Sequence, residues 1–330
     1  MNKVERAIDD IRRKWVPDDR LGVFQVSIEP RRLSGMTSSR SAQEALRRFA
    51  LGAGLAEEVR LLPDATVGAD AAAVVTAALA PLLSDAKVSA PRVSDALHGE
   101  CLEILERRDE WLRVRTQDEY VAWLHAGYVA TGPAEWARDW GERATARSVG
   151  AEITVAGDRR RLPTGARLAL ARDEAVELAD GRSGRVIGGQ VRHAVELRAE
   201  ARMIALPELA QKWYAGAPYL WGGRSEWGID CSGLTQAVYG ARGIQLLRDS
   251  DLQFGQGQEV APTPDGRGYE AGDLLFFAER GRVSHVAMWA GTGHIVHSAL
   301  SRGGVATDHL LGEEPRMRRL RECLVGVRRM

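Results

Sequence analysis

The chain has 330 residues, 45% of them hydrophobic, and its 45 Lys and Arg residues balance its 45 Asp and Glu residues. The length predicts two or three domains, and the zero net charge argues against nucleic acid and strongly anionic membranes as partners. Three cysteines are too few for a disulfide framework. Because the sequence shows neither a signal-peptide core nor an apolar run of about 18 residues, we expect a cytoplasmic protein that does not span a membrane.

Residues 1–80 predict a small N-terminal α/β unit. Residues 20–28 have the pattern of a strand, and residues 41–51 have the apolar spacing of an amphipathic helix. Ser41 followed three residues later by Glu44 resembles a capping box, which predicts the start of this helix. This segment shows no combination of residues typical of a catalytic site.

The segment 81–132 changes to short strands separated by turn signals. Strands are predicted at 101–106, 110–115 and 120–125. A spacing of roughly ten residues between strands is typical of a small barrel. The residues that carry a resemblance to the bacterial SH3-like barrel are Gly99-Glu100, Trp111 and the pair Tyr120-x-x-Trp123.

A second, weaker barrel pattern follows in residues 133–203. Segments 162–168 and 176–186 predict strands, and Asp180-Gly181 within the latter is a hairpin signal. Barrels of this kind are often passive spacers or wall-binding modules, and both interpretations stay open here.

Residues 204–330 contain the clearest chemical signal, Cys231. The turn-forming residues 221–224 lead into it, and the apolar spacing after it predicts a helix over 231–241 that ends near Gly243. A cysteine in the first turn of a helix faces unpaired N–H groups and the positive end of the helix dipole. We therefore expect a lowered thiol pKa and a nucleophilic role for Cys231.

A predicted hairpin downstream supplies two histidines. Strands over 284–289 and 294–298 flank a turn at 290–293. His285 and His297 are expected close to opposite each other, with one acting as base and the other orienting it. A zinc site built from Cys231 and these histidines is not favoured, because neither Cys-x-x-Cys nor His-x-x-x-His spacing occurs. We expect no metal and no organic cofactor.

Four segments in the same order resemble the NlpC-type cysteine peptidases of bacterial cell-wall metabolism. They are 218–223, 230–234, 271–277 and 284–288. The resemblance covers about residues 204–330 and implies a papain-like catalytic domain with Cys231 as nucleophile, His285 as base and His297 as the orienting residue. The expected fold is therefore α+β, with this domain preceded by two SH3-like barrels and the N-terminal unit.

The whole arrangement resembles the cytoplasmic murein-peptide recycling endopeptidases, which cut between γ-D-glutamate and the L-diamino acid of stem peptides. That resemblance implies a small murein peptide as substrate, with Tyr120 near its free N-terminal L-Ala. The residues implied to bind the substrate within the catalytic domain are Tyr219, Asp230, Ser232, Asp249 and Ser250. A barrel glutamate is also expected, but Pro91 and Arg92 stand at its position, with Glu100 nearby.

Several alternatives remain open at this level. Asp230 is equally well explained as a helix N-cap, and Tyr219 as a core residue. The chain as a whole is also compatible with an exported wall hydrolase, a wall-binding module with an inactive peptidase domain, or another amidase on the same core. The sequence carries no signal for an oligomeric state or for a preferred diamino acid.

Overall fold

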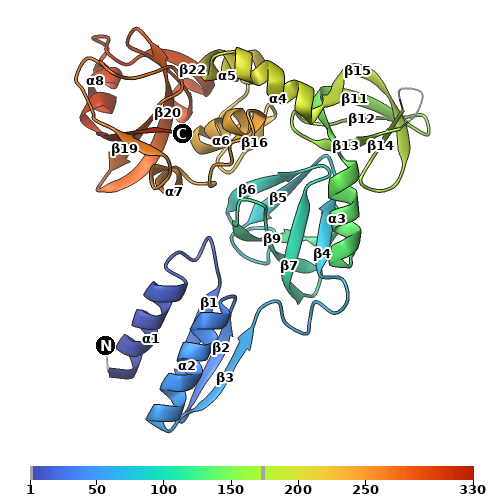
Figure 1. Cartoon of the computed structure of the whole chain (residues 1–330), viewed down its shortest axis with the longest axis vertical. Coiled ribbons are helices and arrows are strands. Elements are labelled where there is room, and N and C mark those ends of the chain that lie inside the picture. The colour runs from blue at the N-terminus through green and yellow to red at the C-terminus, as the bar shows by residue number, and fades with distance from the viewer. Residues whose placement is uncertain (1–2, 172–174) are drawn as a thin grey trace. The chain divides into compact units, whose positions relative to one another are not determined.

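The computed structural model describes residues 3–171 and 175–330 and divides into two compact units, described here separately (Figure 1). The first unit comprises residues up to Val74, Leu83–Pro91 and Cys101–Asp139. The second comprises Val75–Leu82, Arg92–Glu100 and Trp140–Met330. Strands of the predicted first barrel are thus shared between the units. The architecture is α+β, as predicted.

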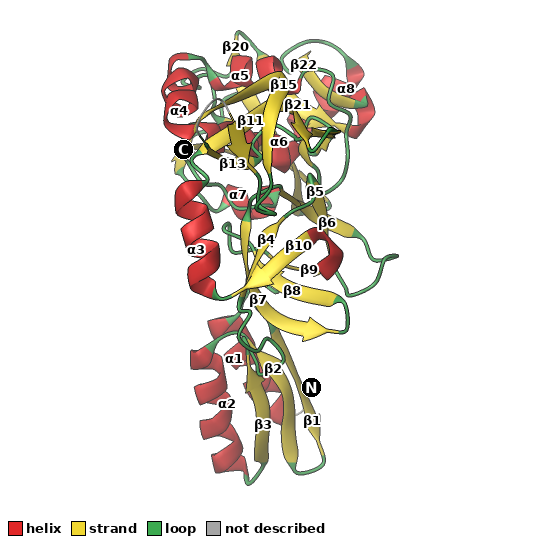
Figure 2. Ribbon diagram, turned by 90° about the vertical axis from the view of Figure 1, so that its right-hand side faces the viewer, coloured by secondary structure: helices red, strands yellow, loops and turns green. Residues whose placement is uncertain are grey.

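The N-terminal part of the first unit is a three-stranded sheet with helix α2 along one face (Figure 2). Its elements are α1 (Lys3–Trp15), β1 (Phe24–Glu29), β2 (Arg32–Thr37), α2 (Arg40–Ala53) and β3 (Ala56–Leu61). β1 and β2 are antiparallel, whereas β2 and β3 are parallel and connected through α2. The predicted strand 20–28 begins later than expected, at Phe24.

Helix α2 is confirmed, but its predicted capping box is wrong. Ser39 is the N-cap, and its hydroxyl accepts the Ala42 N–H at 3.2 Å. Ser41 instead lies inside the first turn. At the other end, Gly54 adopts a left-handed φ of 66° and its N–H bonds the last carbonyls of the helix.

Five barrel strands belong wholly or mainly to the first unit, in the hydrogen-bonded order β10-β4-β7-β8-β9. They are β4 (Ala72–Val75), β7 (Cys101–Arg108), β8 (Trp111–Arg115), β9 (Val121–His125) and β10 (Val129–Gly132). Strands β7, β8 and β9 confirm the three predicted between residues 101 and 125. A short turn η1 (Ala126–Tyr128) and helix α3 (Ala134–Arg143) follow in the chain.

The second unit includes the pair β5 (Leu79–Leu83) and β6 (Arg92–Leu97), and a separate five-stranded sheet. That sheet is made of β11 (Ala146–Val155), β12 (Asp158–Arg161), β13 (Arg167–Leu170), β14 (Ala175–Glu177) and β15 (Ser183–His193). It closes into a barrel because β15 pairs back onto β11. The hairpin at Asp180-Gly181 is confirmed, but the strand predicted over 162–168 begins only at Arg167.

The C-terminal part of the second unit combines helices with a six-stranded antiparallel sheet, ordered β18-β23-β19-β20-β21-β22. Its helical elements are α4 (Ala194–Met203), α5 (Leu206–Tyr214), α6 (Cys231–Ala241), α7 (Ser250–Phe254), η2 (Leu300–Arg302) and α8 (Pro315–Glu322). Its strands are β16 (Arg224–Ser225), β17 (Gly228–Ile229), β18 (Gln258–Val260), β19 (Leu274–Glu279), β20 (Arg282–Gly291), β21 (His294–Ala299), β22 (Gly304–His309) and β23 (Leu324–Arg329). The predicted helix 231–241 is confirmed, as are both strands of the histidine hairpin.

This sheet is buried on both faces. Leu274 and Phe276 of β19 join the core cluster that includes α5 and α6, whereas Leu275 and Phe277 join the cluster that includes Met317 of α8. Successive side chains of a strand point to opposite faces, so burial on both sides explains the continuous apolar run. The sheet therefore forms a fixed support on which α6 positions Cys231.

Candidate active site

The start of α6 is built around Asp230. This residue is the N-cap, and its Oδ1 accepts the Gly233 N–H at 2.7 Å. A Cβ at residue 233 would lie 2.2 Å from the Gly223 carbonyl oxygen, so this position requires glycine. The second oxygen of Asp230 accepts the Gly222 N–H at 2.8 Å, and Gly222 has a φ of +78°. The turn before the helix is therefore folded against the residue that precedes Cys231.

Arg248 neutralises Asp230 in the interior. Its side chain is 0% exposed, and its two Nη atoms bond the two carboxylate oxygens at 3.0 and 2.8 Å. Nη1 also donates to Ser232 Oγ at 3.0 Å, and Nε donates to Ser94 Oγ at 3.0 Å. Because Ser94 belongs to β6, one guanidinium connects β6, the helix start and the segment before α7.

These bonds decide between two interpretations of the predicted substrate residues. The Asp230 carboxylate is buried and already engaged with the helix, the glycine turn and Arg248. Ser232 is also buried, and its hydroxyl accepts from Arg248 and donates to Asp230 at 3.3 Å. The geometry favours the capping role of Asp230 over an ammonium-binding role, and it gives Ser232 a structural role at the same place.

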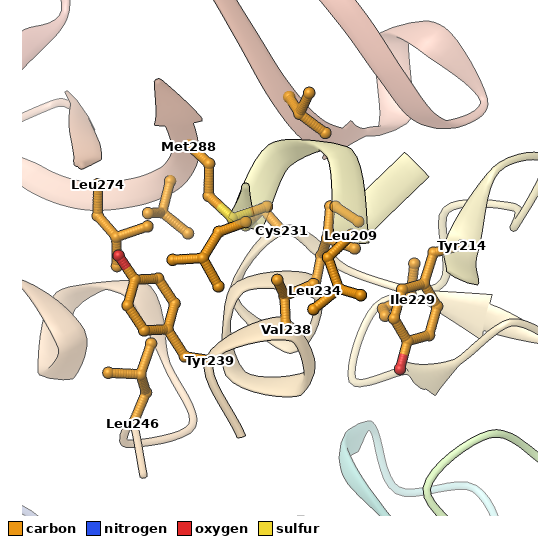
Figure 3. Packing of buried hydrophobic residues seen from close by; sticks show 14 of the residues in the cluster. Leu209, Tyr214, Ile229, Cys231, Leu234, Val238, Tyr239, Leu246, Leu274 and Met288 are labelled. Atoms are coloured by element: carbon orange, nitrogen blue, oxygen red, sulfur yellow. The ribbon is translucent and has the colours of Figure 1, made fainter. Parts of the chain in front are cut away.

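Cys231 is the first residue of α6 and part of a buried apolar cluster (Figure 3). Burial, with a further contribution from the Asp230 carboxylate, raises the pKa of the Cys231 thiol to about 12. The expected lowering of this pKa is therefore wrong, because loss of hydration outweighs the N–H groups at the helix start. The thiol is neutral at rest.

The sulfur lies beside the histidine strand. The Val286 backbone N–H bonds the Cys231 thiol and lowers its pKa, although by less than burial raises it. Val286 directly follows His285 on β20. The structure thus brings the predicted nucleophile to the backbone of the residue next to the predicted base.

The two predicted histidines contact each other. His285 Nε2 and His297 Nδ1 are 2.8 Å apart. Their pairing is diagonal, however, because the observed pair Met288–Val296 shifts the register by two residues from the predicted one. The hairpin turn causes this shift: Gly291 already pairs with His294, so the turn is later and shorter than the predicted turn at 290–293, and the irregularity between Trp289 and Gly291 changes the register by only one residue.

Asp308 extends the pair to a chain of three residues, and the sequence analysis missed it. His297 Nε2 lies 3.1 Å from Asp308 Oδ2 on β22. The bond to His297, followed by the charges of Arg302 and Arg316, holds the pKa of Asp308 below its usual value despite partial burial. The available signal was strand alternation: His297 pairs with Ala306, and residue 308 lies on the same face.

The chain fixes the tautomers of both rings. An ionised Asp308 only accepts, so His297 carries its proton on Nε2 and accepts at Nδ1. His285 Nε2 must then donate to His297, which leaves His285 Nδ1 as the basic nitrogen. Burial, assisted by His297, lowers the pKa of His285 to about 3, so the ring is neutral at neutral pH and able to accept a proton.

Tyr219 lies at the edge of this site. Burial, followed by the neighbouring Cys231 and Asp230, raises the pKa of the Tyr219 hydroxyl, which therefore remains a proton donor. Its backbone N–H donates to the Gly303 carbonyl at 2.9 Å, which holds the segment before the glycine turn. The residue is only partly buried, and contact of its hydroxyl with a substrate stays a prediction.

The remaining predicted substrate residues are placed as follows. Asp249 occupies the N-cap position of α7 and Ser250 is the buried first residue of that helix, directly after Arg248. Tyr120 is a buried residue of the first unit, immediately before β9. Contact of these three residues with a substrate stays a prediction.

No free carboxylate takes the place of the expected barrel glutamate within the described part of the second unit. Arg92 pairs with the fully buried Asp95 at 3.1 Å, and burial raises the pKa of Asp95 to about 6. Glu100 pairs with Arg224 at 3.1 Å. The Arg92–Asp95 pair thus lies within β6, whereas Glu100 joins the turn after β6 to Arg224 of β16.

Among residues 3–171 and 175–330, no group of three or more His, Cys, Asp or Glu side chains is arranged to hold a metal ion. In the same residues, no helix is both long and apolar enough to cross a membrane.

A cysteine at a helix start beside a histidine–histidine–aspartate chain, on an antiparallel sheet, defines a cysteine peptidase domain of the α+β class. Residues 216–321 match the NlpC/P60 family, and residues 82–127 match the bacterial dipeptidyl-peptidase Sh3 domain. The chain thus carries an NlpC/P60 cysteine peptidase domain preceded by a bacterial SH3-like domain.

Curated relatives agree with this assignment. A γ-D-glutamyl-L-lysine dipeptidyl-peptidase of Bacillus cereus is 43% identical over 90 residues, which span 26% of this chain and 26% of that relative. Dipeptidyl-peptidase 6 of Lysinibacillus sphaericus is 26% identical over 265 residues, which span 74% of this chain and 93% of that protein. The crystal structure of an NlpC/P60 family protein from Bacillus cereus covers 78% of this chain and 99% of its own, with a TM-score of 0.62 and 21% identity, and so shares the fold.

The buried ion pair predicts a large stability effect. Arg248→Met leaves the Asp230 carboxylate buried without its counter-charge, so the free energy of unfolding should fall by about 3–5 kcal/mol. Urea denaturation measures this loss. Arg202→Met, at an exposed arginine of α4, is the matched control and should change stability by less than about 0.5 kcal/mol. An Asp230→Asn, Arg248→Met double variant should lose less than the sum of the two single losses, and strict additivity would contradict the pairing.

Proposed function

We propose that the protein is a cysteine endopeptidase that hydrolyses the γ-D-Glu–L-diamino acid bond of peptidoglycan stem peptides with a free N-terminal L-Ala. In this proposal it acts on small murein peptides in the cytoplasm, as part of cell-wall peptide recycling. The observation that carries the chemistry is the chain from His285 through His297 to Asp308 beside Cys231. The substrate is supported by the name of the Bacillus cereus relative.

The mechanism begins from a neutral thiol and a neutral imidazole. As the sulfur of Cys231 attacks the γ-carbonyl carbon of D-Glu, its proton passes to His285 Nδ1. The developing oxyanion meets the Cys231 backbone N–H and the hydroxyl of Tyr219. His285 then gives the proton to the departing amine, which leaves a thioester on Cys231.

The second half of the reaction uses the same groups in reverse. A water molecule gives its proton to His285 Nδ1 as its oxygen attacks the thioester carbonyl. The thiolate leaves, takes back the proton and releases the peptide with a free γ-carboxylate. Throughout, His297 accepts from His285 Nε2, and the ionised Asp308 stabilises the positive charge that forms on the two rings.

Loss of the nucleophile should abolish turnover. Cys231→Ser and His285→Ala should each lower the rate of L-Ala-γ-D-Glu-diaminopimelate cleavage by several orders of magnitude, because each removes a group that acts on the reacting atoms. His297→Gln should be milder, since an amide can still bond the ring. Product masses after timed incubation measure the rates, with Cys323→Ser as control. A larger loss at His297 than at His285 would reverse the two roles.

Asp308 should act through His297 rather than on the substrate. Asp308→Ala removes the acceptor that fixes the His297 tautomer, so kcat should fall by about 10- to 100-fold with little change in KM. Asp308→Asn keeps an oxygen that accepts the same proton and should recover part of this loss. If the alanine and asparagine variants were equally slow, the hydrogen bond would not be the relevant interaction.

The specificity for a free N-terminus depends on Tyr120. If this residue contacts the L-Ala end, wild-type protein should cleave the free tripeptide at least about tenfold faster than its N-acetylated form, because a buried polar group would lose its partner. Tyr120→Ala should reduce that ratio. A ratio near one for both proteins, together with release of peptides from intact peptidoglycan, would instead favour an exported wall hydrolase. Cleavage of unrelated amides only would favour another amidase.

A further inference from the structure

A cavity of about 210 Å³ lies in the second unit, apart from the catalytic residues. Its walls come from β11 and β13 of the second barrel and from α4, α5 and the C-terminal half of α6 (Figure 1). Cys231, His285 and His297 do not line it. Nothing in the peptidase mechanism uses this cavity.

The charge of the lining is strongly positive. Arg147, Arg167, Arg198 and Arg224 all line the cavity, whereas Glu100 is the one acidic residue in its lining. The ion pair of Glu100 with Arg224 engages that single negative charge. Arg147 and Arg198, which also line the cavity, add two further positive charges to the same small space.

Two of these arginines have no acidic partner among the described residues. Among the described residues, the Arg147 guanidinium bonds only the carbonyls of Ala144 and Ala146, both at 2.9 Å. Arg198 forms no ion pair with any of the described residues. Burial and the positive charge of Arg167 lower the pKa of Arg147 to about 10; the Glu100 carboxylate offsets part of this shift, and the charge of Arg198 adds to it. Arg147 is still charged at neutral pH, and its neighbours repel it.

The helix ends nearby offset only part of this charge. Arg198 lies beside Gly243, just past the C-terminal end of α6, where the helix dipole favours a cation. That end carries roughly half an elementary negative charge, which is less than the excess of the arginines. A bound anion would neutralise the remainder.

We propose that this cavity binds one small multivalent oxyanion, of the phosphate or polycarboxylate class, between Arg147 and Arg198. Guanidinium groups bind such anions through paired, charge-assisted hydrogen bonds. Leu97, Leu197 and Trp213 give the cavity an apolar side, which suits the carbon skeleton of a small organic anion. The site is independent of the peptidase activity proposed above.

The test uses the full-length protein with inorganic phosphate and, separately, citrate. Each anion should bind with a stoichiometry of one by calorimetry and raise the melting temperature in a saturable manner, compared with sodium chloride at equal ionic strength. Arg147→Gln and Arg198→Gln should each weaken binding by about tenfold or more, because each removes a charged hydrogen-bond donor. Tighter binding of phosphate than of citrate assigns the bound anion to the phosphate class, and the reverse assigns it to the polycarboxylate class.

The controls separate this site from the rest of the protein. Arg202→Gln removes an exposed arginine of α4, the helix that also carries Arg198, and Arg202 does not line the cavity. The affinity of this variant for either anion should equal that of the wild type. Cys231→Ala should also bind normally, so failure of the proposed peptidase activity would leave this result unchanged. Arg147→Gln also removes bonds to two carbonyls and could therefore unfold the protein. In that case the Arg198→Gln variant provides the test, because Arg198 is exposed. Equal binding by wild type and Arg198→Gln, or no saturable effect of either anion, would overturn the proposal.

Discussion

The ion pair between Asp230 and Arg248 is the interaction on which the site depends. Asp230 caps the helix that begins with Cys231, and Arg248 holds that cap in place while it also bonds Ser94 of β6. Taking two charges out of water costs several kcal/mol per ion, so this arrangement is favourable only because nearly every donor and acceptor finds a partner. The position of the proposed nucleophile is thus set by residues from three segments of the chain: β6, the start of α6 and the segment before α7.

The same removal from water determines how the catalytic groups ionise. It raises the pKa of the Cys231 thiol and lowers that of His285, so both are neutral in the resting protein. A charged pair is then needed only while the reaction proceeds, when the helix start and the Val286 N–H stabilise the sulfur. Asp308 supplies the matching negative charge at the other end, through His297. The site therefore places its fixed dipoles where charge develops rather than maintaining a thiolate.

Features that depend on residues close together in the sequence were predicted better than features that depend on residues brought together by the fold. The bounds of α6 depend on neighbouring residues, such as the cap Asp230 and the glycine turn, and were predicted correctly. Both strands of the histidine hairpin were also predicted, but β20 extends beyond its predicted end to Gly291. Arg248 also bonds Ser94, 154 residues away in the chain, which a linear pattern does not encode. Asp308 could have been found from strand alternation, because it lies on the same face as His297. The diagonal histidine register depends on where the hairpin turn forms, which is later in the chain than predicted. The Cys231 pKa was mispredicted because the helix dipole is visible in a sequence, whereas burial is a property of the packed fold.

Helix α6 also shows how the chain distributes its arginines. At the N-terminal end, the helix dipole favours an acid, and Asp230 is there with Arg248 as its full counter-charge. At the C-terminal end the dipole favours cations, and Arg198 is placed accordingly. Both ends of α6 thus carry the charge that the helix dipole favours. Only at the N-terminal end does the protein itself supply a full counter-charge, through Arg248. Arg147 bonds the carbonyls of Ala144 and Ala146, but the positive charges beside it oppose folding. A charge retained at such a cost is most simply explained by a partner that the chain does not supply.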